Sequence, residues 1–176
     1  GRHTLTVRVD NRLQVGVGVN AHSVSDHTQG NWNGMVGDLK LVAMDPVWIE
    51  DLQVYPQLAK GNLRVSVLVR NPLGYPGKGR LRLRVEALEP ARPERLAAQD
   101  VEVELKSTEQ RVETDYPMGS RPHFWDEFTP LRYQLEARWQ TVGTPHRFTD
   151  RQTAEFGWRE FGTLGTHFAI NGRPTF

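Results

Sequence analysis

The sequence predicts an all-β chain built from β-sandwiches, and three observations support this prediction. Several segments alternate between apolar and polar residues, which is the pattern of strands that are buried on one face. Turn signals rich in glycine and proline separate these segments. No window of the sequence carries a helical apolar stripe bounded by capping residues. Many short strands joined by such turns are typical of a sandwich.

The alternation is clearest in five segments: residues 4–9, 63–69, 81–85, 101–105 and 131–139. In residues 81–85 the polar positions are arginines, and in residues 101–105 they are glutamates. One face of each strand is therefore expected to pack and the other to contact water. Weaker strand candidates are residues 38–43, 47–54, 146–156 and 167–170.

Strand candidates are unevenly distributed along the chain, which predicts its domain organisation. Residues 45–158 hold about seven of them in about 110 residues, the size of an immunoglobulin-like sandwich. Residues 1–44 hold two, on either side of a polar loop at residues 16–37. Two strands are not stable alone, so this part needs partner strands. The chain closes on a strand candidate and a tight turn at Asn171-Gly172.

Composition excludes several classes of protein and site. The chain has 176 residues with 22 basic and 21 acidic side chains, a balance that argues against a nucleic-acid partner. It has no cysteine, so disulfides and thiolate metal sites are excluded. No apolar run approaches the roughly 20 residues of a membrane-spanning helix, so no membrane partner is expected.

A resemblance to a known family rests on five segments in a fixed order. They are "VDNR" (9–12), "HTQGNWNGMVGDLKL" (27–41), "VWIEDLQVYP" (47–56), "FWDEFTPLRYQLEARW" (124–139) and "FGWREFGTLGTHFAINGRPTF" (156–176). Together they resemble glycoside hydrolase family 2, the β-galactosidase and β-glucuronidase enzymes. In that family a jelly-roll sugar-binding domain comes first, an immunoglobulin-like domain second and a (β/α)₈ catalytic barrel third.

The resemblance implies a fold for each part of the chain. Residues 1–44 match the last strands of an incomplete jelly roll, and residues 45–158 match the immunoglobulin-like β-sandwich. Residues 159–176 match the exit segment that leads toward the catalytic barrel, which is absent from this sequence. The implied role of the chain is to brace that barrel, its partner in the parent enzyme.

The resemblance also implies that the parent enzyme hydrolyses β-glycosides with retention, with β-galactosides as the first expectation. Retaining enzymes use two carboxylates about 5 to 5.5 Å apart, and in this family both lie in the barrel. We therefore expect no catalytic residue, metal or cofactor in this chain, and carbohydrate as a partner only through the parent enzyme. Asp126 and Glu127 are no substitute, because neighbours on an extended segment point to opposite sides. The compartment is not fixed, although a periplasmic or secreted location is favoured for a bacterial parent.

The polar loop supplies the candidate binding residues. By the resemblance, loops of this domain reach the rim of the substrate pocket, and Asp26, Asn31 and Trp32 are the candidates. His22, Asp26 and His27 lie close together in sequence, but no third histidine is near, so no metal site is expected.

The remaining tryptophans have structural interpretations. Trp139 closes an alternating apolar set and is expected in the core, while Trp48 is expected at a domain contact. By the resemblance, Trp125 packs the edge of the sandwich and Trp158 packs the joint toward the barrel. Arg159 is expected to anchor that joint.

Two alternative functions stay open at this point. The chain is a free-standing carbohydrate-binding or adhesion module, or it is a structural immunoglobulin-like domain of an unrelated surface protein. If residues 1–44 are the last strands of an incomplete jelly roll, their edges are unpaired, which favours pairing with another chain. We therefore expect either a homodimer through this region or disorder in it.

Overall fold

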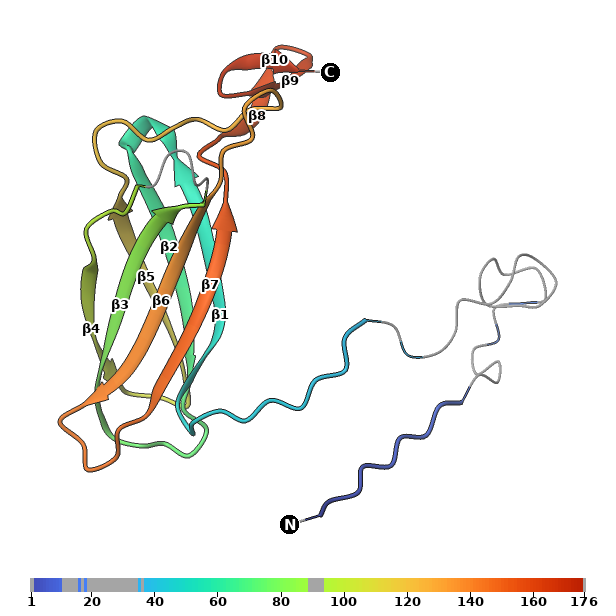
Figure 1. Ribbon diagram of the computed structural model, residues 1–176, viewed down its shortest axis with the longest axis vertical. Coiled ribbons are helices and arrows are strands. Elements are labelled where there is room, and N and C mark those ends of the chain that lie inside the picture. Colours follow the sequence, from blue (N-terminus) through green and yellow to red (C-terminus); the bar gives the residue numbers. More distant parts are fainter. Residues whose placement is uncertain are drawn as a thin grey trace. The chain divides into compact units, whose positions relative to one another are not determined.

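The computed structural model of the chain is built from β-strands (Figure 1). It describes residues 2–10, 16, 18, 35, 37–88 and 94–175. The chain divides into two compact units, Gly1–Val42 and Ala43–Phe176. In the described part of the chain, no helix is long and apolar enough to cross a membrane.

The described residues of the first unit form no strand. Residues 4–9 and 38–43 were predicted as strands from their alternation, but neither is paired with another segment. Their apolar side chains are exposed, and Leu5 is 85% accessible to solvent. A strand exists only where its backbone groups find a neighbouring strand, and an alternating pattern does not supply one. The assignment of residues 1–44 to a jelly roll stays a prediction.

The second unit is a sandwich of two antiparallel sheets. One sheet has the order β1-β2-β5, and the other has the order β4-β3-β6-β7. In the first, β1 is Trp48–Gln57, β2 is Asn62–Arg70 and β5 is Glu109–Pro117; the short 3-10 helix η1, Leu58–Lys60, joins β1 to β2. In the second, β3 is Gly77–Ala87, β4 is Gln99–Leu105, β6 is Tyr133–Val142 and β7 is Thr149–Phe156. Figure 1 shows the sheets as two layers, which confirms the predicted all-β sandwich.

Alternation decides which side chains enter the core. On β2, Leu63, Val65, Val67 and Val69 are fully buried, and on β3 the same holds for Leu81, Leu83 and Val85. The side chains of β6 that point into the same core are Tyr133, Leu135, Ala137 and Trp139. Full burial of one such large apolar side chain contributes roughly 1.5 to 3 kcal/mol. The predicted inward faces of these strands are therefore confirmed.

Trp139 is, with Trp158, one of the two largest buried side chains among the described residues, and it lies against Gly79 on the neighbouring strand β3. A Cβ atom at Gly79 would lie 1.8 Å from Cη2 of the indole ring. Because any side chain at position 79 would occupy the space of the ring, glycine is required there by close approach. The predicted place of Trp139 in the core is confirmed.

Tyr116 connects β5 to the opposite sheet. Its hydroxyl donates to the carbonyl of Ala97 at 2.6 Å and accepts from the backbone N–H of Val85 at 3.3 Å. Burial raises the pKa of the Tyr116 hydroxyl above its usual value, because the phenolate would lose its hydration. The hydrogen bond with Val85 of β3 links β5 to the opposite sheet, and both bonds satisfy the buried hydroxyl.

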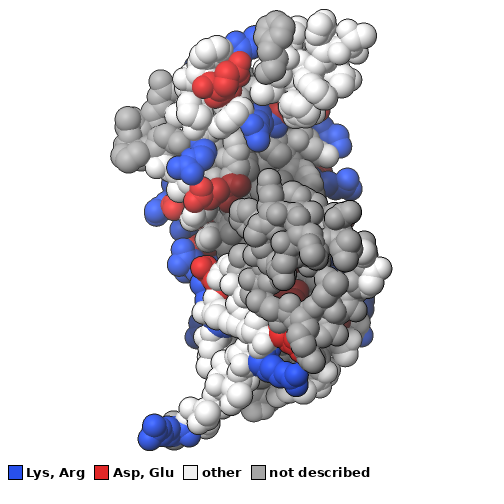
Figure 2. All heavy atoms as spheres, turned by 90° about the vertical axis from the view of Figure 1, so that its right-hand side faces the viewer, with Lys and Arg blue, Asp and Glu red and all other residues white. Residues whose placement is uncertain are grey.

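The outer faces of the sheets carry ion pairs, some between neighbouring strands and one, Glu136 with Arg138, within β6. Arg82 donates to Asp100 through Nε and Nη2, at 2.7 and 2.8 Å. Glu136 accepts from Arg138 and Arg151, each at 2.6 Å. On the face shown in Figure 2, basic and acidic side chains lie beside one another, as expected for a solvated sheet surface.

Candidate functional site

The predicted rim residues Asp26, Asn31 and Trp32 lie outside the described residues, as do His22 and His27. Their role in substrate binding therefore stays a prediction. The described residues show a different feature at one end of the sandwich, where the chain leaves it (Figure 1).

The segment that follows the sandwich folds into a small antiparallel sheet, here called the C-terminal sheet. Its strands are β8 (Phe161–Leu164), β9 (His167–Ile170) and β10 (Arg173–Thr175), in the order β10-β9-β8. Asn171 and Gly172 join β9 to β10, with φ angles of 52° and 76°. A two-residue hairpin of type I′ needs positive φ at both central positions, which explains the Asn-Gly pair. The tight turn predicted at these residues is present.

Asn171 connects the C-terminal sheet to the loop of residues 124–129. Its side-chain Nδ2 donates to the carbonyl of Trp125 at 2.9 Å. Its Oδ1 accepts from the N–H of Glu160 at 2.9 Å, and its own N–H donates to the Glu160 carbonyl at 2.8 Å. The same loop also reaches the end of the sandwich, because Trp125 N–H donates to the carbonyl of Trp158 at 3.0 Å. The Asn171 side chain therefore joins three segments: its own turn, the start of the C-terminal sheet at Glu160 and the 124–129 loop at Trp125.

Trp125 is the packing element of this joint. A Cβ at Gly157 would lie 2.6 Å from Cγ of Trp125, so glycine allows the indole to lie directly on the backbone. On the ring, the guanidinium carbon of Arg159 lies 4.0 Å from the centroid, a cation–π contact. Trp158 is buried, with 2% of its surface accessible. Trp125 and Arg159 thus pack where the sandwich ends, as the resemblance implied.

Asp126 and Glu127 have structural partners in the same loop. Asp126 Oδ1 accepts from the N–H groups of Phe128 and Thr129, at 2.9 and 2.7 Å, and so forms an Asx turn. Glu127 accepts from Arg173 of β10 at 2.8 Å, and the Arg173 guanidinium lies 5.4 Å from the Phe128 ring centroid. The residues described by the structure contain no group of three histidine, aspartate or glutamate side chains placed to hold a metal ion.

One face of the C-terminal sheet exposes aromatic side chains, here called the phenylalanine face. Phe161 and Phe168 are 62% and 61% accessible, and their rings stack with centroids 5.4 Å apart. The register pairs Phe168 with Thr163 and Phe161 with Ile170, so both phenylalanines point to the same side of the sheet. Exposed apolar groups that gather in this way are typical of interaction surfaces.

Between η1, the 124–129 loop and the C-terminal sheet lies an open groove of about 640 Å³. It is lined by Leu58, Ala59, Phe124, Asp126, Glu160, Ile170, Asn171 and Arg173. Sequence reasoning did not find this groove, because its walls come from three segments that are distant in the chain. Trp48 lies elsewhere, at the start of β1, where its Nε1 donates to Glu50 at 2.6 Å.

Comparison with solved structures gives the same fold in larger proteins. A glycosyl hydrolase family 2 member from Bacteroides cellulosilyticus aligns with a TM-score of 0.61 and 18% identity, over 74% of this chain and 18% of that chain. A putative β-galactosidase from Bacteroides fragilis aligns with a TM-score of 0.56 and 14% identity, over 75% and 20%. A β-galacturonidase from Eisenbergiella tayi gives 0.53 and 21%, over 74% and 21%. At these identities the likeness shows the fold alone.

The chain spans only about a fifth of the length of these solved structures. A comparison with curated protein sequences gives no match. The family model of the glycosyl hydrolases family 2 matches residues 47–159, which is more than half of the chain and nearly all of the sandwich. The chain therefore belongs to the glycosyl hydrolases family 2.

Proposed function

We propose that this chain is a non-catalytic β-sandwich region of a retaining glycoside hydrolase, and that it braces the catalytic barrel of its parent enzyme. The observation that supports this role is the C-terminal sheet, which is tied to the sandwich on one side and presents the phenylalanine face on another. A brace needs both properties, a fixed direction and a surface that adheres to the part it supports.

The fixed direction comes from the contacts of Asn171 and Trp125 with the end of the sandwich. The adhesion comes from Phe161 and Phe168, which are more than half exposed. Burial of a phenylalanine contributes roughly 1.5 to 3 kcal/mol, so covering both rings would stabilise a contact with the barrel substantially. The barrel in turn would gain a rigid neighbour.

For the substrate we propose a β-glycoside, with β-galactosides as the first to test. The solved structures similar to this chain include proteins described as a β-galactosidase, a β-glucuronidase and a β-galacturonidase, so the family fold serves more than one sugar. Asp26, Asn31 and Trp32 are proposed to reach the rim of the substrate pocket, on the basis of the sequence resemblance.

The experiment is to determine the coding sequence that follows Phe176, to express the longer protein and to assay it. We expect a (β/α)₈ barrel with two glutamates at strand ends and hydrolysis of nitrophenyl β-galactoside with retention. The 176-residue chain alone should show no turnover. An unrelated continuation, or tight saturable binding of β-galactosides by the chain alone, would favour the free-standing module instead.

The brace itself is tested in the longer protein by replacing Phe161 and Phe168 with serine. The double variant should lower the melting temperature of the barrel, because the barrel loses its apolar contact. Replacement of Leu73, an exposed residue of the β2–β3 turn, is the matched control and should leave that temperature unchanged. Equal effects of the two changes would contradict the bracing role.

We also propose that the 176-residue chain dimerises through residues 1–44. The described part of this region forms no strand, and its apolar side chains are exposed. Sedimentation velocity should give a dimer for the chain and a monomer for a version that begins at Ala43. A monomer in both cases would refute the proposal.

A further inference from the structure

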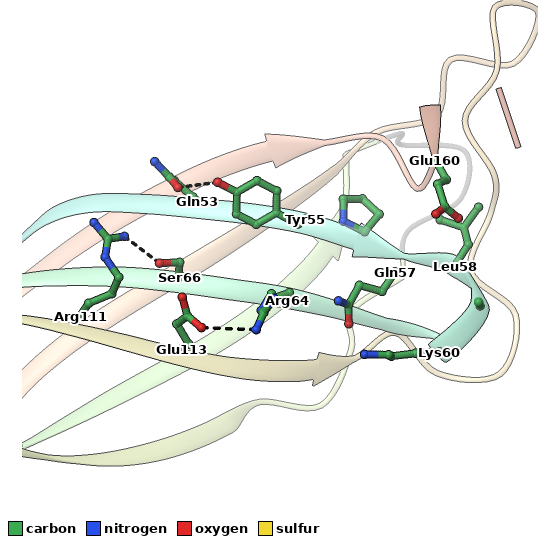
Figure 3. A pocket seen from close by; sticks show the side chains of 12 residues that line it. Gln53, Tyr55, Gln57, Leu58, Lys60, Arg64, Ser66, Arg111, Glu113 and Glu160 are labelled. Carbon is green, nitrogen blue, oxygen red and sulfur yellow. Dashed lines mark hydrogen bonds and ion pairs between the residues drawn. The ribbon is translucent and has the colours of Figure 1, made fainter. Parts of the chain in front are cut away.

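The outer face of the β1-β2-β5 sheet carries a groove of about 800 Å³ that the proposed brace does not use (Figure 3). It extends from the middle of the sheet to η1. Its lining consists mostly of polar and charged side chains: Gln53, Tyr55, Gln57, Lys60, Arg64, Ser66, Arg111, Glu113 and Glu160.

A small residue, Ser66, lies at the bottom of the groove. Ser66 lies on the central strand β2, between Gln53 of β1 and Glu113 of β5 in the register. Its neighbours along the outward face of β2 are Arg64 and Leu68, both much longer. Ser66 is only 5% accessible, because longer neighbouring side chains, Arg111 among them, cover it.

Two guanidinium groups reach toward this floor from either side. Arg111 Nη1 donates to Ser66 Oγ at 2.9 Å, and Arg64 Nη2 lies 3.5 Å from Glu113 Oε2 (Figure 3). Each guanidinium carries several N–H donors, so most of them remain available to a ligand. Among the described residues, Lys60 forms no ion pair. Three cationic side chains thus face two carboxylates in the lining.

An aromatic ring stands beside these donors. Tyr55 is 51% accessible, and its hydroxyl donates to Gln53 Oε1 at 2.5 Å, which restrains the ring at the edge of the groove. At the η1 end, Gln57 Oε1 is buried and has no hydrogen-bond partner in the described part of the chain. Leaving such a group unsatisfied is costly, and because this oxygen is not accessible, a ligand hydroxyl would reach it only after the Gln57 side chain turns toward the groove.

We propose that this groove is a binding site for an acidic oligosaccharide, one whose sugar units carry carboxylates. The apolar face of a sugar ring stacks on an aromatic side chain such as Tyr55, and its hydroxyls bond to amides and carboxylates. The excess of donors from Lys60, Arg64 and Arg111 requires a ligand rich in acceptors, and a carboxylate matches a guanidinium in charge and shape. Arg64 already pairs with Glu113, whereas a neutral sugar leaves Lys60 and Arg111 without a charged partner among the described residues. The site is independent of the bracing role.

The test is calorimetric titration of the 176-residue chain at 50 mM salt with trigalacturonate and with maltotriose, its neutral counterpart of equal length. Trigalacturonate should bind saturably with one site per chain, at least about tenfold more tightly than maltotriose, because a hydrogen bond to a charged group is stronger than a neutral one. Raising the salt to 0.5 M should weaken the binding of the acidic sugar only.

Variants locate the site. Arg111→Gln should weaken trigalacturonate binding about tenfold or more. Arg111→Lys should weaken it less, since lysine keeps the positive charge and loses only the paired N–H donors of the guanidinium. Tyr55→Ala should weaken both sugars. Arg80→Gln, on the outer face of the opposite sheet, removes the same charge and is the matched control. Each variant is checked for its fold by near-ultraviolet circular dichroism.

Three results would overturn the proposal. The first is the absence of saturable binding of trigalacturonate by the unmodified chain. The second is equal affinity for the acidic and the neutral sugar. The third is an equal loss of affinity in the Arg111 and Arg80 variants, which would show that net charge and not the groove carries the binding.

Discussion

Asn171 offers the sharpest test of how the C-terminal sheet is held. Replacing it with glycine removes both side-chain hydrogen bonds, to the Trp125 carbonyl and from the Glu160 N–H, but keeps the freedom to adopt φ of 52°. Replacing it with alanine removes the same bonds and keeps a β-carbon in the left-handed region, as Asn171 has, but without the polar side chain that lets asparagine tolerate this region. The pair of variants therefore separates hydrogen bonding from backbone strain.

The expected magnitude follows from these contacts. Each hydrogen bond contributes about 1 kcal/mol net, so the glycine variant should lose about 2 kcal/mol of the free energy that holds the sheet closed. Since about 1.4 kcal/mol is a factor of ten, opening should become roughly thirtyfold more frequent. The alanine variant carries a further cost of about 1 to 2 kcal/mol for the left-handed backbone.

Hydrogen exchange measured by nuclear magnetic resonance reports this opening residue by residue. The Glu160 amide, which donates to Asn171, should exchange roughly thirtyfold faster in the glycine variant and faster still in the alanine variant. Amides of the sandwich core, such as those of Val67 and Leu135, should keep their protection. They serve as the internal reference, because they exchange through opening of the sandwich itself.

Three outcomes would contradict parts of this reasoning. Unchanged protection of the Glu160 amide in both variants would mean that Asn171 does not hold the sheet. An equal loss of protection at Val67 would mean that the sheet and the sandwich open as one unit. Equal behaviour of the glycine and alanine variants would refute the strain argument alone.

Three further predictions concern the sandwich. Gly79→Ala should lower the free energy of unfolding in urea by about 1 to 3 kcal/mol, because its β-carbon overlaps the Trp139 ring. The raised pKa of Tyr116 means that the folded state keeps this proton longer than the unfolded one, so stability should fall as pH rises above about 10, and less steeply in Tyr116→Phe. The hydrogen bond from Arg138 lowers the pKa of Glu136, so thermal unfolding should show stability lost as pH falls below about 4.5, and less in Glu136→Gln.

The sequence clearly predicted the strands whose inward positions are all apolar. Strands whose inward positions are mixed were predicted only as weaker candidates, such as residues 146–156 at β7, or were missed. β2 and β3 alternate without a break, and both were identified. β5 was missed, because Val112 and Tyr116 share their side of the strand with Gln110 and Thr114. β5 lies at the edge of its sheet, where a partly polar inward face is tolerated.

The opposite error concerns residues 4–9. Their alternation equals that of β4, yet they form no strand. The difference lies in the partner: β4 pairs with β3 along its whole length, from Gln99 to Leu105. A sequence pattern shows which side chains are apolar and so favour burial. A strand also needs a neighbouring strand for its backbone hydrogen bonds, and the pattern contains no information about that neighbour.

The joint at the C-terminal sheet was predictable in part. The Asn-Gly turn and the structural roles of Trp125 and Arg159 followed from local motifs and from the resemblance. The bond between Asn171 and Trp125 did not, because it joins positions 46 residues apart and depends on how two loops meet in space. The periodicity of a sequence predicts helices and strands, but it does not predict contacts between loops.

The size of the C-terminal sheet explains why its two sides differ. Its strands have four, four and three residues, too few to enclose an apolar core of their own. Its order must therefore come from neighbours. The 124–129 loop supplies one through Asn171, and Ala169 is buried, while Phe161 and Phe168 face away exposed. Two exposed stacked phenylalanines on so small a sheet are typical of a surface that binds another part of a protein, as the proposed brace requires. Bracing would then be mutual, since the surface that covers these rings would order the sheet by the same burial that attaches the sandwich to it.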